Sequence, residues 1–506
     1  MFLIGVLILM IKVNVKRYDP VEDLHYTESY EIEKTPKMKV LDALHQINKK
    51  YDANIAYRYS CRAGQCGSCA IKVNGEAVLA CKAEIQDDDT LEALDFDIIK
   101  DLIVNREPFS EEVRDLNLYL GYENEEFARE PEILKPETYE KSDRLRSCIG
   151  CYSCLSMCPV LKKTENFAGP YFMRNLADIS FDPRDDTSRN DELKDSGLYY
   201  CTSCGQCTKT CPKEIDIYGK AIELMRAKIF NEKEGPLPAH KNVRQMVIDS
   251  NRTVKPDENG AYPEGFIKKY HEDNEDKNAK VAFFTGCMID YKLPWIAEYL
   301  VDLFDKLGID VDIPEGQVCC GSPLLRTGQI DIVPDLVNKN YEVFKDYDTI
   351  ITVCAGCGAT LKNNYPEYGV ELNVMDISEF LQDKLNPDDM NELNLRVTYH
   401  DPCHLVRSQN ISEEPRKILK SLKGVEFIEM EKPAQCCGAG GGVKSGKPEI
   451  AEALADEKVD MIDKLDVDYV VTICPFCEYN IGDSLKKKGS KTSVINMMEL
   501  LNKAYE

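Results

Sequence analysis

The sequence lacks any apolar run long enough to cross a membrane. Its most apolar stretch, residues 1–11, falls short of the roughly 20 residues that a spanning helix needs. Marks of an export signal are missing too, because no basic residue precedes this stretch and no small-residue cleavage site follows it. We expect an over-extended start or a buried first strand, with a peripheral membrane anchor as the alternative, and we leave open whether residues 1–9 belong to the native protein. A cytoplasmic location is the prediction.

Positive charge is also scarce relative to negative charge. The 506 residues include 63 Lys and Arg against 88 Asp and Glu, which gives a formal net charge of −25. This balance argues against nucleic acid or an anionic membrane surface as a partner. A hydrophobic fraction of 43% suits ordinary globular cores, and the length suits about three domains. No dinucleotide-binding fingerprint is evident.

Cysteine, in contrast, is abundant. All 22 cysteines fall into clustered motifs, which leaves no orphan thiol to form a disulfide. The short C-x2-C and Cys-Cys spacings are typical of metal ligands and indicate a reducing compartment.

Two copies of one four-cysteine pattern lie between residues 148 and 212. Each has the spacing C-x2-C-x2-C-x3-C-P of bacterial two-cluster ferredoxins, in which the fourth cysteine binds the other cluster. We therefore predict two [4Fe-4S] clusters, and zinc sites are the disfavoured alternative. The ligand sets are Cys148, Cys151, Cys154 and Cys211 for one cluster, and Cys158, Cys201, Cys204 and Cys207 for the other.

A different cysteine loop lies nearer the start of the chain. Apolar and polar residues alternate from Ile11 and again from Tyr26, which predicts two strands. In residues 39–50 the apolar residues stand at helical spacing. A C-x4-C-x2-C run with a distant fourth cysteine then follows, which is the plant-type [2Fe-2S] spacing. Asn74-Gly75 predicts a hairpin turn that returns the chain to that fourth cysteine. The predicted ligands are Cys61, Cys66, Cys69 and Cys81.

After Lys280 the chain repeats itself. A strand-like segment before Cys287 recurs before Cys403, 116 positions later, and the Cys-Cys-Gly and C-x2-C motifs recur at similar offsets. Strands followed by helices predict an α/β fold with cysteines at strand ends. The fifth cysteine of each copy exceeds what a cubane or zinc needs, so it is a spare, a redox thiol or a ligand of an unusual cluster. The sets are Cys287, Cys319, Cys320, Cys354 and Cys357, and Cys403, Cys436, Cys437, Cys474 and Cys477.

Residues 12–230 resemble the iron-sulfur subunit of succinate dehydrogenases and fumarate reductases. The likeness lies in the loop from Arg58 to Ala70, in Asn74-Gly75 and before Cys81. It implies a β-grasp domain and a flavoprotein partner whose FAD interconverts succinate and fumarate. That family usually lacks one cysteine of the second ferredoxin run and holds a [3Fe-4S] cluster near a quinone site. Cys204 is present here, which indicates a second [4Fe-4S] cluster and weakens the case for quinone.

The duplicated half resembles the cysteine-rich domain in the B subunit of heterodisulfide reductases. In that family each complete motif binds a noncubane [4Fe-4S] cluster, and the disulfide of coenzyme M and coenzyme B is cleaved between the two. Both copies are complete here, so the resemblance implies two noncubane clusters and thiol-disulfide chemistry.

Four residues near these cysteines are candidates for substrate contacts. His404 would donate a proton to a departing thiolate, and a structural hydrogen bond is the equal alternative. Lys444, Lys447 and Arg407 would bind an anionic thiol, unless they only face solvent. The glycine-rich run before Pro448 resembles a phosphate loop, but Pro448 stands where Ser or Thr is required. We expect its glycines to give the backbone room beside a cluster or substrate.

Together the resemblances are those of the thiol-driven fumarate reductases of methanogenic archaea, whose iron-sulfur subunit the chain resembles. The implied reaction oxidises coenzyme M and coenzyme B to their heterodisulfide and passes electrons to the flavoprotein subunit of the fumarate reductase. A fused subunit of a succinate:quinone reductase and a pure electron carrier are the alternatives. The expected architecture is α+β and multidomain, with a β-grasp domain, a helical ferredoxin domain, a linker and two α/β cysteine-rich repeats, at 1–105, 106–230, 231–280, 281–390 and 391–506.

Overall fold

The structure is a computed structural model that describes residues 9–116, 118–121, 144–185, 187–273 and 279–506. The open question about the start of the chain thus falls mostly outside the described residues. Two compact units are present, and each is described by itself. The first comprises residues 1–161, 168–196 and 206–222, and the second comprises 162–167, 197–205 and 223–506.

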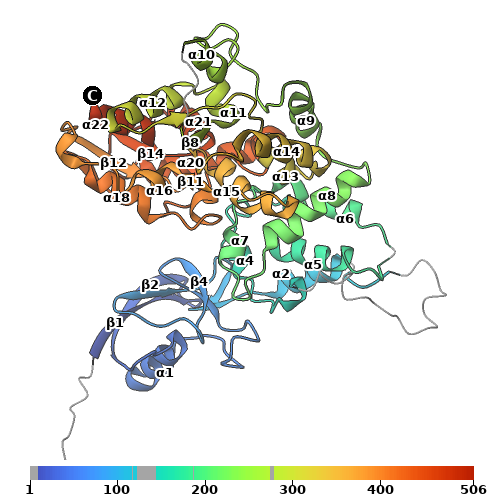
Figure 1. Ribbon diagram of the computed structural model, residues 1–506. Helices are drawn as coiled ribbons and strands as arrows, with labels where there is room; N and C mark the ends of the chain where they lie inside the picture. Colours follow the sequence, from blue (N-terminus) through green and yellow to red (C-terminus); the bar gives the residue numbers. More distant parts are fainter. Residues whose placement is uncertain (1–8, 117, 122–143, 186, 274–278) are drawn as a thin grey trace, which may run out of the picture. The chain divides into compact units, whose positions relative to one another are not determined.

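The first unit contains a five-stranded mixed sheet in the order β2-β1-β5-β3-β4 (Figure 1). β1 pairs antiparallel with β2 and parallel with β5. Ile11, Val13 and Val15 are buried because successive side chains of a strand point to opposite faces. The strands are β1 (Leu9–Asp19), β2 (Leu24–Lys34), β3 (Ala70–Val73), β4 (Glu76–Leu79) and β5 (Asp89–Glu92), and a separate pair is β6 (Ile98–Lys100) and β7 (Ile103–Val104).

The predicted helix and hairpin of this sheet are both present. α1 (Val40–Tyr51) buries Val40, Leu41, Leu44 and Ile47 along one face, as the helical spacing predicts. Asn74 and Gly75 join β3 to β4 with φ values of 52° and 83°. Positive φ at both central residues defines the type I′ turn that Asn-Gly favours. The hairpin thereby returns the chain to Cys81.

Short helices form the rest of the first unit. They are α2 (Glu107–Asp115), α4 (Ser153–Ser156), α5 (Pro170–Ser180), α6 (Asn190–Asp195) and α7 (Gln206–Lys209). α4 and α7 each begin within one of the two ferredoxin-type runs. The π-helix η4 (Ile217–Glu223) then leads towards α8.

The second unit contains two four-stranded parallel sheets of the same topology. The strand orders are β11-β10-β8-β9 and β13-β12-β14-β15, so the elements of the second sheet follow those of the first one for one. The strands are β8 (Val281–Phe284), β9 (Val311–Asp312), β10 (Thr349–Thr352), β11 (Val374–Asp376), β12 (Leu395–Tyr399), β13 (Val425–Phe427), β14 (Tyr469–Thr472) and β15 (Ser493–Asn496). The mixed α+β architecture and the duplicated α/β fold are confirmed.

Helices pack against both sheets of the second unit (Figure 1). One apolar cluster joins the two repeats, with Phe283 and Ile351 from the first and Val397 and Val471 from the second. The helices are α8 (Leu224–Asn231), α9 (Pro238–Ser250), α10 (Phe266–Asp273), α11 (Gly286–Tyr291), α12 (Trp295–Leu307), α13 (Ser322–Thr327), α14 (Val333–Phe344), α15 (Ala355–Asn363), α16 (Ile377–Leu381), α17 (Cys403–Val406), α18 (Glu413–Ser421), α19 (Val443–Gly446), α20 (Pro448–Ile462), α21 (Pro475–Lys488) and α22 (Met497–Tyr505).

Four cysteines of the two repeats follow the carboxyl ends of strands. Cys287 follows β8, Cys354 follows β10, Cys403 follows β12 and Cys474 follows β14. Parallel strands collect such loops at one edge of the sheet. Among the residues that the structure describes, no helix combines the length and apolar character that a membrane crossing requires.

Candidate iron-sulfur centres

The plant-type loop of the first unit holds its first sulfur in a backbone cradle. The N–H groups of Ala63 and Gln65 donate to Cys61 Sγ at 3.4 and 3.3 Å. Hydrogen bonds from the backbone of Cys61 and from Ser68 lower the pKa of Cys66 to about 6. A sulfur that accepts several N–H groups is stabilised as the thiolate, which is the form that binds iron.

The other two ligands of this set, Cys69 and Cys81, are buried in the core of the same unit. Burial raises the pKa of Cys69 to about 11. The thiol therefore retains its proton until a metal displaces it. Cys61 remains exposed, so this site has one edge towards the surface.

Within the first unit this loop lies directly against the first ferredoxin run. Gly67 has φ +66°, and a Cβ built there would lie 2.7 Å from Ile149 O and 3.0 Å from Cys151 Cα. Only glycine permits this approach without a steric clash. Arg106, which sequence reasoning missed, lies over the Tyr152 ring at 5.4 Å, and the charges of Cys69 and Cys151 both act on it. The two predicted centres are therefore neighbours.

The four thiols of the first predicted [4Fe-4S] set surround one small cavity. Its lining includes Cys148, Cys151, Cys154 and Cys211. Burial raises the pKa of Cys154 well above its ordinary value and also raises that of Cys211. The exchange of the fourth cysteine between the two runs, which the spacing predicts, brings Cys211 to this set.

The second predicted [4Fe-4S] set is divided between the units. Cys158 and Cys207 belong to the first unit, and Cys201 and Cys204 belong to the second. The assembly of these four thiols stays a prediction. What the second unit does define is the surroundings of the segment Cys201–Gly205.

Arg226 holds this segment to both cysteine-rich repeats. Its guanidinium, 0% exposed, donates to Leu198 O at 2.8 Å, to Cys201 O at 2.8 Å, to Arg326 O at 2.6 Å and to Gly441 O at 3.0 Å. Burial raises the pKa of Cys201 to about 11, and the positive charge of Arg226 opposes that rise. A single side chain thus joins the segment that carries Cys201 and Cys204 to the first and second repeats.

The glycine-rich run explains how these backbones approach. A Cβ at Gly441 would lie 2.4 Å from Cys201 O, and a Cβ at Gly440 would lie 2.7 Å from Thr202 O. A Cβ at Gly442 would lie 2.8 Å from His240 Nε2. The glycines therefore make room for the cysteine segment that packs on them, and no described feature of the run resembles a phosphate site.

His404 and Arg407 also contact this segment. His404 Nε2 lies 2.9 Å from Ser203 O, and Arg407 donates to Cys204 O at 2.8 Å and to Ala434 O at 2.6 Å. Burial lowers the pKa of His404 to about 4, so the ring is neutral and its Nε2–H donates to the carbonyl. This geometry favours the structural alternative for His404, and its role as a proton donor stays a prediction.

All ten cysteines of the two repeats line one cavity of about 310 Å³. Cys437 Sγ and Cys477 Sγ are 3.3 Å apart, and the N–H groups of Gly321 and Gly438 donate to the sulfurs of Cys319 and Cys436 at 3.4 and 3.3 Å. The two motifs that the sequence places 116 to 120 positions apart therefore face the same space.

The thiols of this cavity divide into strong and weak acids in both repeats. The Cys319 and Cys357 thiols lower the pKa of Cys320 to about 6. The Cys477 thiol, together with His400, lowers the pKa of Cys437 to about 5. Cys357 and Cys474 lower the pKa of Cys354 well below its ordinary value, so the influence crosses from one repeat to the other. The second cysteine of each Cys-Cys pair is therefore ready to bind iron as a thiolate.

The donor set of the cavity fits iron-sulfur chemistry. Among the residues that the structure describes, those lining the cavity include ten cysteines and no Asp or Glu. Such soft donors favour thiophilic metals over Mg²⁺ or Ca²⁺. Four thiols satisfy zinc, and five per repeat exceed that number. The residues thus fit an iron-sulfur group in each repeat.

Of the candidate cations, Lys444 lines the cavity and Lys447 does not. Lys444 Nζ lies 3.6 Å from Asp483, whereas Lys447 donates to the Tyr200 hydroxyl at 3.0 Å and lies over its ring. Arg326 also lines the cavity and was not predicted from the sequence. It pairs with the buried Glu223 and donates to Asn364 at 2.9 Å.

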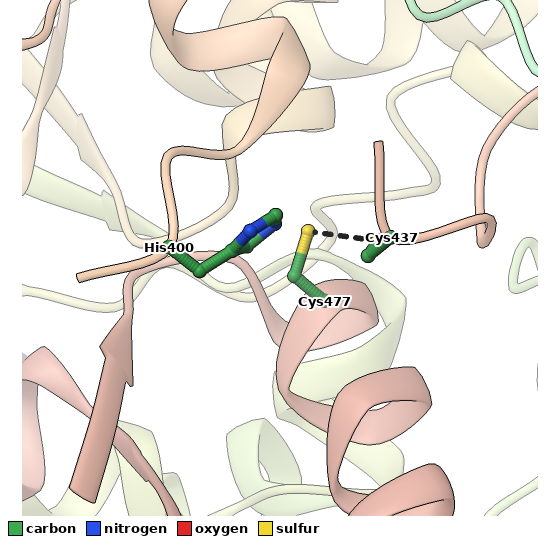
Figure 2. Close-up of side chains that lie close together, drawn as sticks. All are labelled: His400, Cys437 and Cys477. Atoms are coloured by element: carbon green, nitrogen blue, oxygen red, sulfur yellow. Dashed lines mark hydrogen bonds between the residues drawn. The ribbon is translucent and has the colours of Figure 1, made fainter. Parts of the chain in front are cut away.

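His400 is a further residue that motif reasoning missed. It lies with Cys437 and Cys477, and the ring nitrogens and sulfurs are all within 4.8 Å of one another (Figure 2). The signal was present in the sequence, since His400 stands three positions before Cys403 where the first copy has Phe284 before Cys287.

Comparisons with known proteins define the class. A family model for a 2Fe-2S iron-sulfur cluster binding domain matches residues 12–111, and one for a 4Fe-4S dicluster domain matches residues 144–215. A model for a cysteine-rich domain matches twice, at residues 281–362 and 397–482. The chain is an iron-sulfur protein with [2Fe-2S] and [4Fe-4S] domains followed by a duplicated cysteine-rich domain.

Relatives narrow this class. The B subunit of fumarate reductase (CoM/CoB) from Methanothermobacter marburgensis is 53% identical over 98% of this chain and 99% of its own length. The D subunit of dihydromethanophenazine:CoB–CoM heterodisulfide reductase from Methanosarcina mazei is 31% identical over 71% of this chain and 94% of its own length. The crystal structure of a hypothetical protein from Helicobacter pylori, 13% identical with a TM-score of 0.63 over 98% of this chain and 95% of that one, shows likeness of fold alone.

The chain belongs to the family of the B subunit of fumarate reductase (CoM/CoB), and it is an iron-sulfur subunit of an oxidoreductase of several subunits.

Proposed function

We propose that this chain oxidises coenzyme M and coenzyme B thiols to their heterodisulfide and passes the two electrons to a flavoprotein subunit that reduces fumarate. In the balanced reaction two S–H bonds break, one S–S bond forms, and two electrons and two protons are taken up by fumarate to give succinate. The name of the Methanothermobacter relative supports this reaction. The FAD would lie in the partner.

One observation carries the proposal: both complete cysteine motifs open into a single cavity of about 310 Å³. Formation of one S–S bond requires two thiols in one enclosed space. A cavity of this volume accommodates small thiols, and the two repeats contribute to it equally. The ten cysteines named above would hold a noncubane [4Fe-4S] cluster in each repeat, which supplies one-electron acceptors beside the reacting sulfurs.

The protein residues around the cavity bind and orient the thiols. Lys444 lines it and carries the positive charge that an anionic thiol needs, and Arg326, which pairs with Glu223, lines it as well. The cavity is lined mainly by cysteine, glycine and apolar groups, so the attraction between charges is stronger there than in bulk water.

The packing of the second unit supports an exit for electrons through the second repeat. Cys436 Sγ lies 3.6 Å from Thr202 Oγ1, next to the proposed cubane ligands Cys201 and Cys204. The second repeat thus brings a cysteine of the thiol site into contact with this ferredoxin segment. From there electrons would pass through the other cubane to the [2Fe-2S] centre, since Gly67 brings that loop against Cys151.

The test is an assay of the purified complex for fumarate reduction with the two thiols, compared with quinol as the electron donor. Turnover with the thiols supports the proposal, and turnover with quinol alone contradicts it in favour of a quinone reductase. Replacing Cys320 or Cys437 with Ala should abolish thiol oxidation while reduced benzyl viologen still drives fumarate reduction. Loss of both activities, with the other clusters intact, would contradict this division of labour.

A further inference from the structure

His400 is a buried polar side chain beside the Cys437 thiol, on which it acts electrostatically. It directly follows β12 and is 0% exposed. Neither Nδ1 nor Nε2 has a hydrogen-bond partner among the residues that the structure describes. A neutral imidazole presents one donor and one acceptor, and leaving both unsatisfied in the interior is costly. Such a group is normally paired, so a partner for the ring has to be identified.

The ring points at sulfur. Figure 2 shows His400 directed towards the pair formed by Cys437 and Cys477, and the donor atoms of the three residues lie within 4.8 Å of one another. Both cysteines line the ten-thiol cavity. The unpaired N–H of His400 is thus directed at the place where the proposed cluster of the second repeat would sit.

The first repeat lacks this feature. Phe284, three positions before Cys287, occupies the place that His400 holds before Cys403. It directly precedes the first-repeat cysteine loop as the last residue of β8, and it is buried in the apolar core of that repeat. A phenyl ring cannot donate a hydrogen bond to sulfur. The two copies have the same number of cysteines, but only the second has this hydrogen-bond donor.

Positive groups act on the cysteines of both repeats. In the first repeat Arg252, which pairs with Asp290, acts on Cys287, and in the second repeat the positive group is Lys458. Lys458 is fully buried on α20 and donates to Lys432 O at 2.6 Å and to Pro433 O at 3.2 Å. Its charge acts on Cys436, Cys437 and Cys477. Positive groups and N–H donors near an iron-sulfur group both favour its more negative, reduced state.

We propose that His400 is a positioning residue that donates a hydrogen bond to a sulfur of the second-repeat cluster and gives that cluster a higher reduction potential than its first-repeat counterpart. The inference rests on the proposed function, because it requires a cluster on each cysteine set. It assigns the two clusters different tasks, since electrons collect at the second-repeat cluster, which lies beside the ferredoxin segment.

The experiment is a redox titration of the whole complex followed by EPR, with iron and sulfide analysis of each variant. His400→Phe, which reproduces the residue of the first copy, should retain its iron and lower the midpoint potential of one cluster. The expected shift corresponds to about a tenfold change in the equilibrium constant, or about 59 mV for one electron. His400→Gln keeps an N–H donor and should restore most of the potential. Phe284→Leu, the matched control in the first copy, should leave the potential of the second-repeat cluster unchanged.

Three results would overturn the inference. An unchanged potential in His400→Phe, with iron retained, refutes it and leaves the proposed function intact. If His400→Phe fails to fold, the His400→Gln variant is the test. A full iron content together with a midpoint potential near that of the wild type supports the hydrogen bond. Loss of iron from both His400 variants would make His400 a ligand rather than a hydrogen-bond donor. Absence of clusters from both repeats of the wild-type complex would instead refute the proposed function, and the inference with it.

Discussion

Gly441→Ala should displace the segment that carries Cys201 and thereby empty one predicted [4Fe-4S] centre. A Cβ at this position would lie 2.4 Å from Cys201 O and 2.6 Å from Thr202 C, and both contacts are with backbone that cannot rotate away. Ordinary contacts begin at 3.4 Å, so the cysteine segment would have to retreat by about 1 Å. Metal–ligand distances tolerate only about 0.2 Å.

A matched control separates this steric effect from backbone strain. Gly489 has φ +65°, nearly equal to the +64° of Gly441, but a Cβ there meets nothing within 4 Å. Both alanine variants carry the strain of a positive φ, roughly 1 to 2 kcal/mol. Only Gly441→Ala adds the clash with Cys201.

Iron and sulfide analysis of the two purified variants measures the difference. Gly441→Ala should contain about four fewer iron ions per chain than Gly489→Ala, the content of one cubane. Urea denaturation should show a larger loss of stability for Gly441→Ala than for Gly489→Ala. Equal iron content and equal stability of the two variants would refute the close approach of the glycine run to the cysteine segment.

Three further predictions concern the second unit. Arg226→Met leaves four buried carbonyls without their donor, which costs about 1 to 3 kcal/mol for each carbonyl. Urea denaturation should therefore show a free energy of unfolding lower by at least about 4 kcal/mol. A decrease below about 1 kcal/mol would contradict the role of the guanidinium. Burial raises the pKa of Asp376 from 3.8 to about 6. The free-energy cost of burying its ionised carboxylate is therefore fully present above pH 6 and fades as the pH falls towards 3.8. Asp376→Asn should therefore stabilise the protein by about 3 kcal/mol at pH 8 and by about half as much at pH 5, whereas a gain independent of pH would contradict this titration. Lys444→Ala should raise KM for an anionic thiol roughly fivefold, the effect of about 1 kcal/mol, with kcat little changed, and the control Lys447→Ala should not; equal effects of the two variants would contradict the placement of Lys444 at the cavity.

Local patterns were enough to predict the elements of the fold. Asn74-Gly75 predicts its own turn because few residue pairs accept positive φ twice, and alternation from Ile11 onwards predicts the buried face of β1. The duplication was visible because strand ends and cysteines recur together, and the parallel sheets that it predicts are present.

Residues that act through distant contacts could not be predicted. The partners of Arg226 are backbone carbonyls from three parts of the chain, and carbonyls leave no mark in a sequence. His400 belongs to no ligand motif; the repeat sets it against Phe284, but its role becomes apparent only from its distance to Cys437 and Cys477. Nor does spacing reveal that the glycine run packs on Cys201, since the two segments are far apart in the chain.

The short distance between Cys437 Sγ and Cys477 Sγ, 3.3 Å, bears on how the protein must mature. A disulfide needs about 2.05 Å, so these sulfurs would have to move together by only about 1.2 Å to cross-link. An iron-free chain that meets an oxidant would close this bridge and lose two donors of one motif. Iron therefore has to be delivered before the protein is exposed to oxygen. Heterologous expression that does not supply iron under strictly anaerobic conditions should yield an inactive protein that is cross-linked between Cys437 and Cys477.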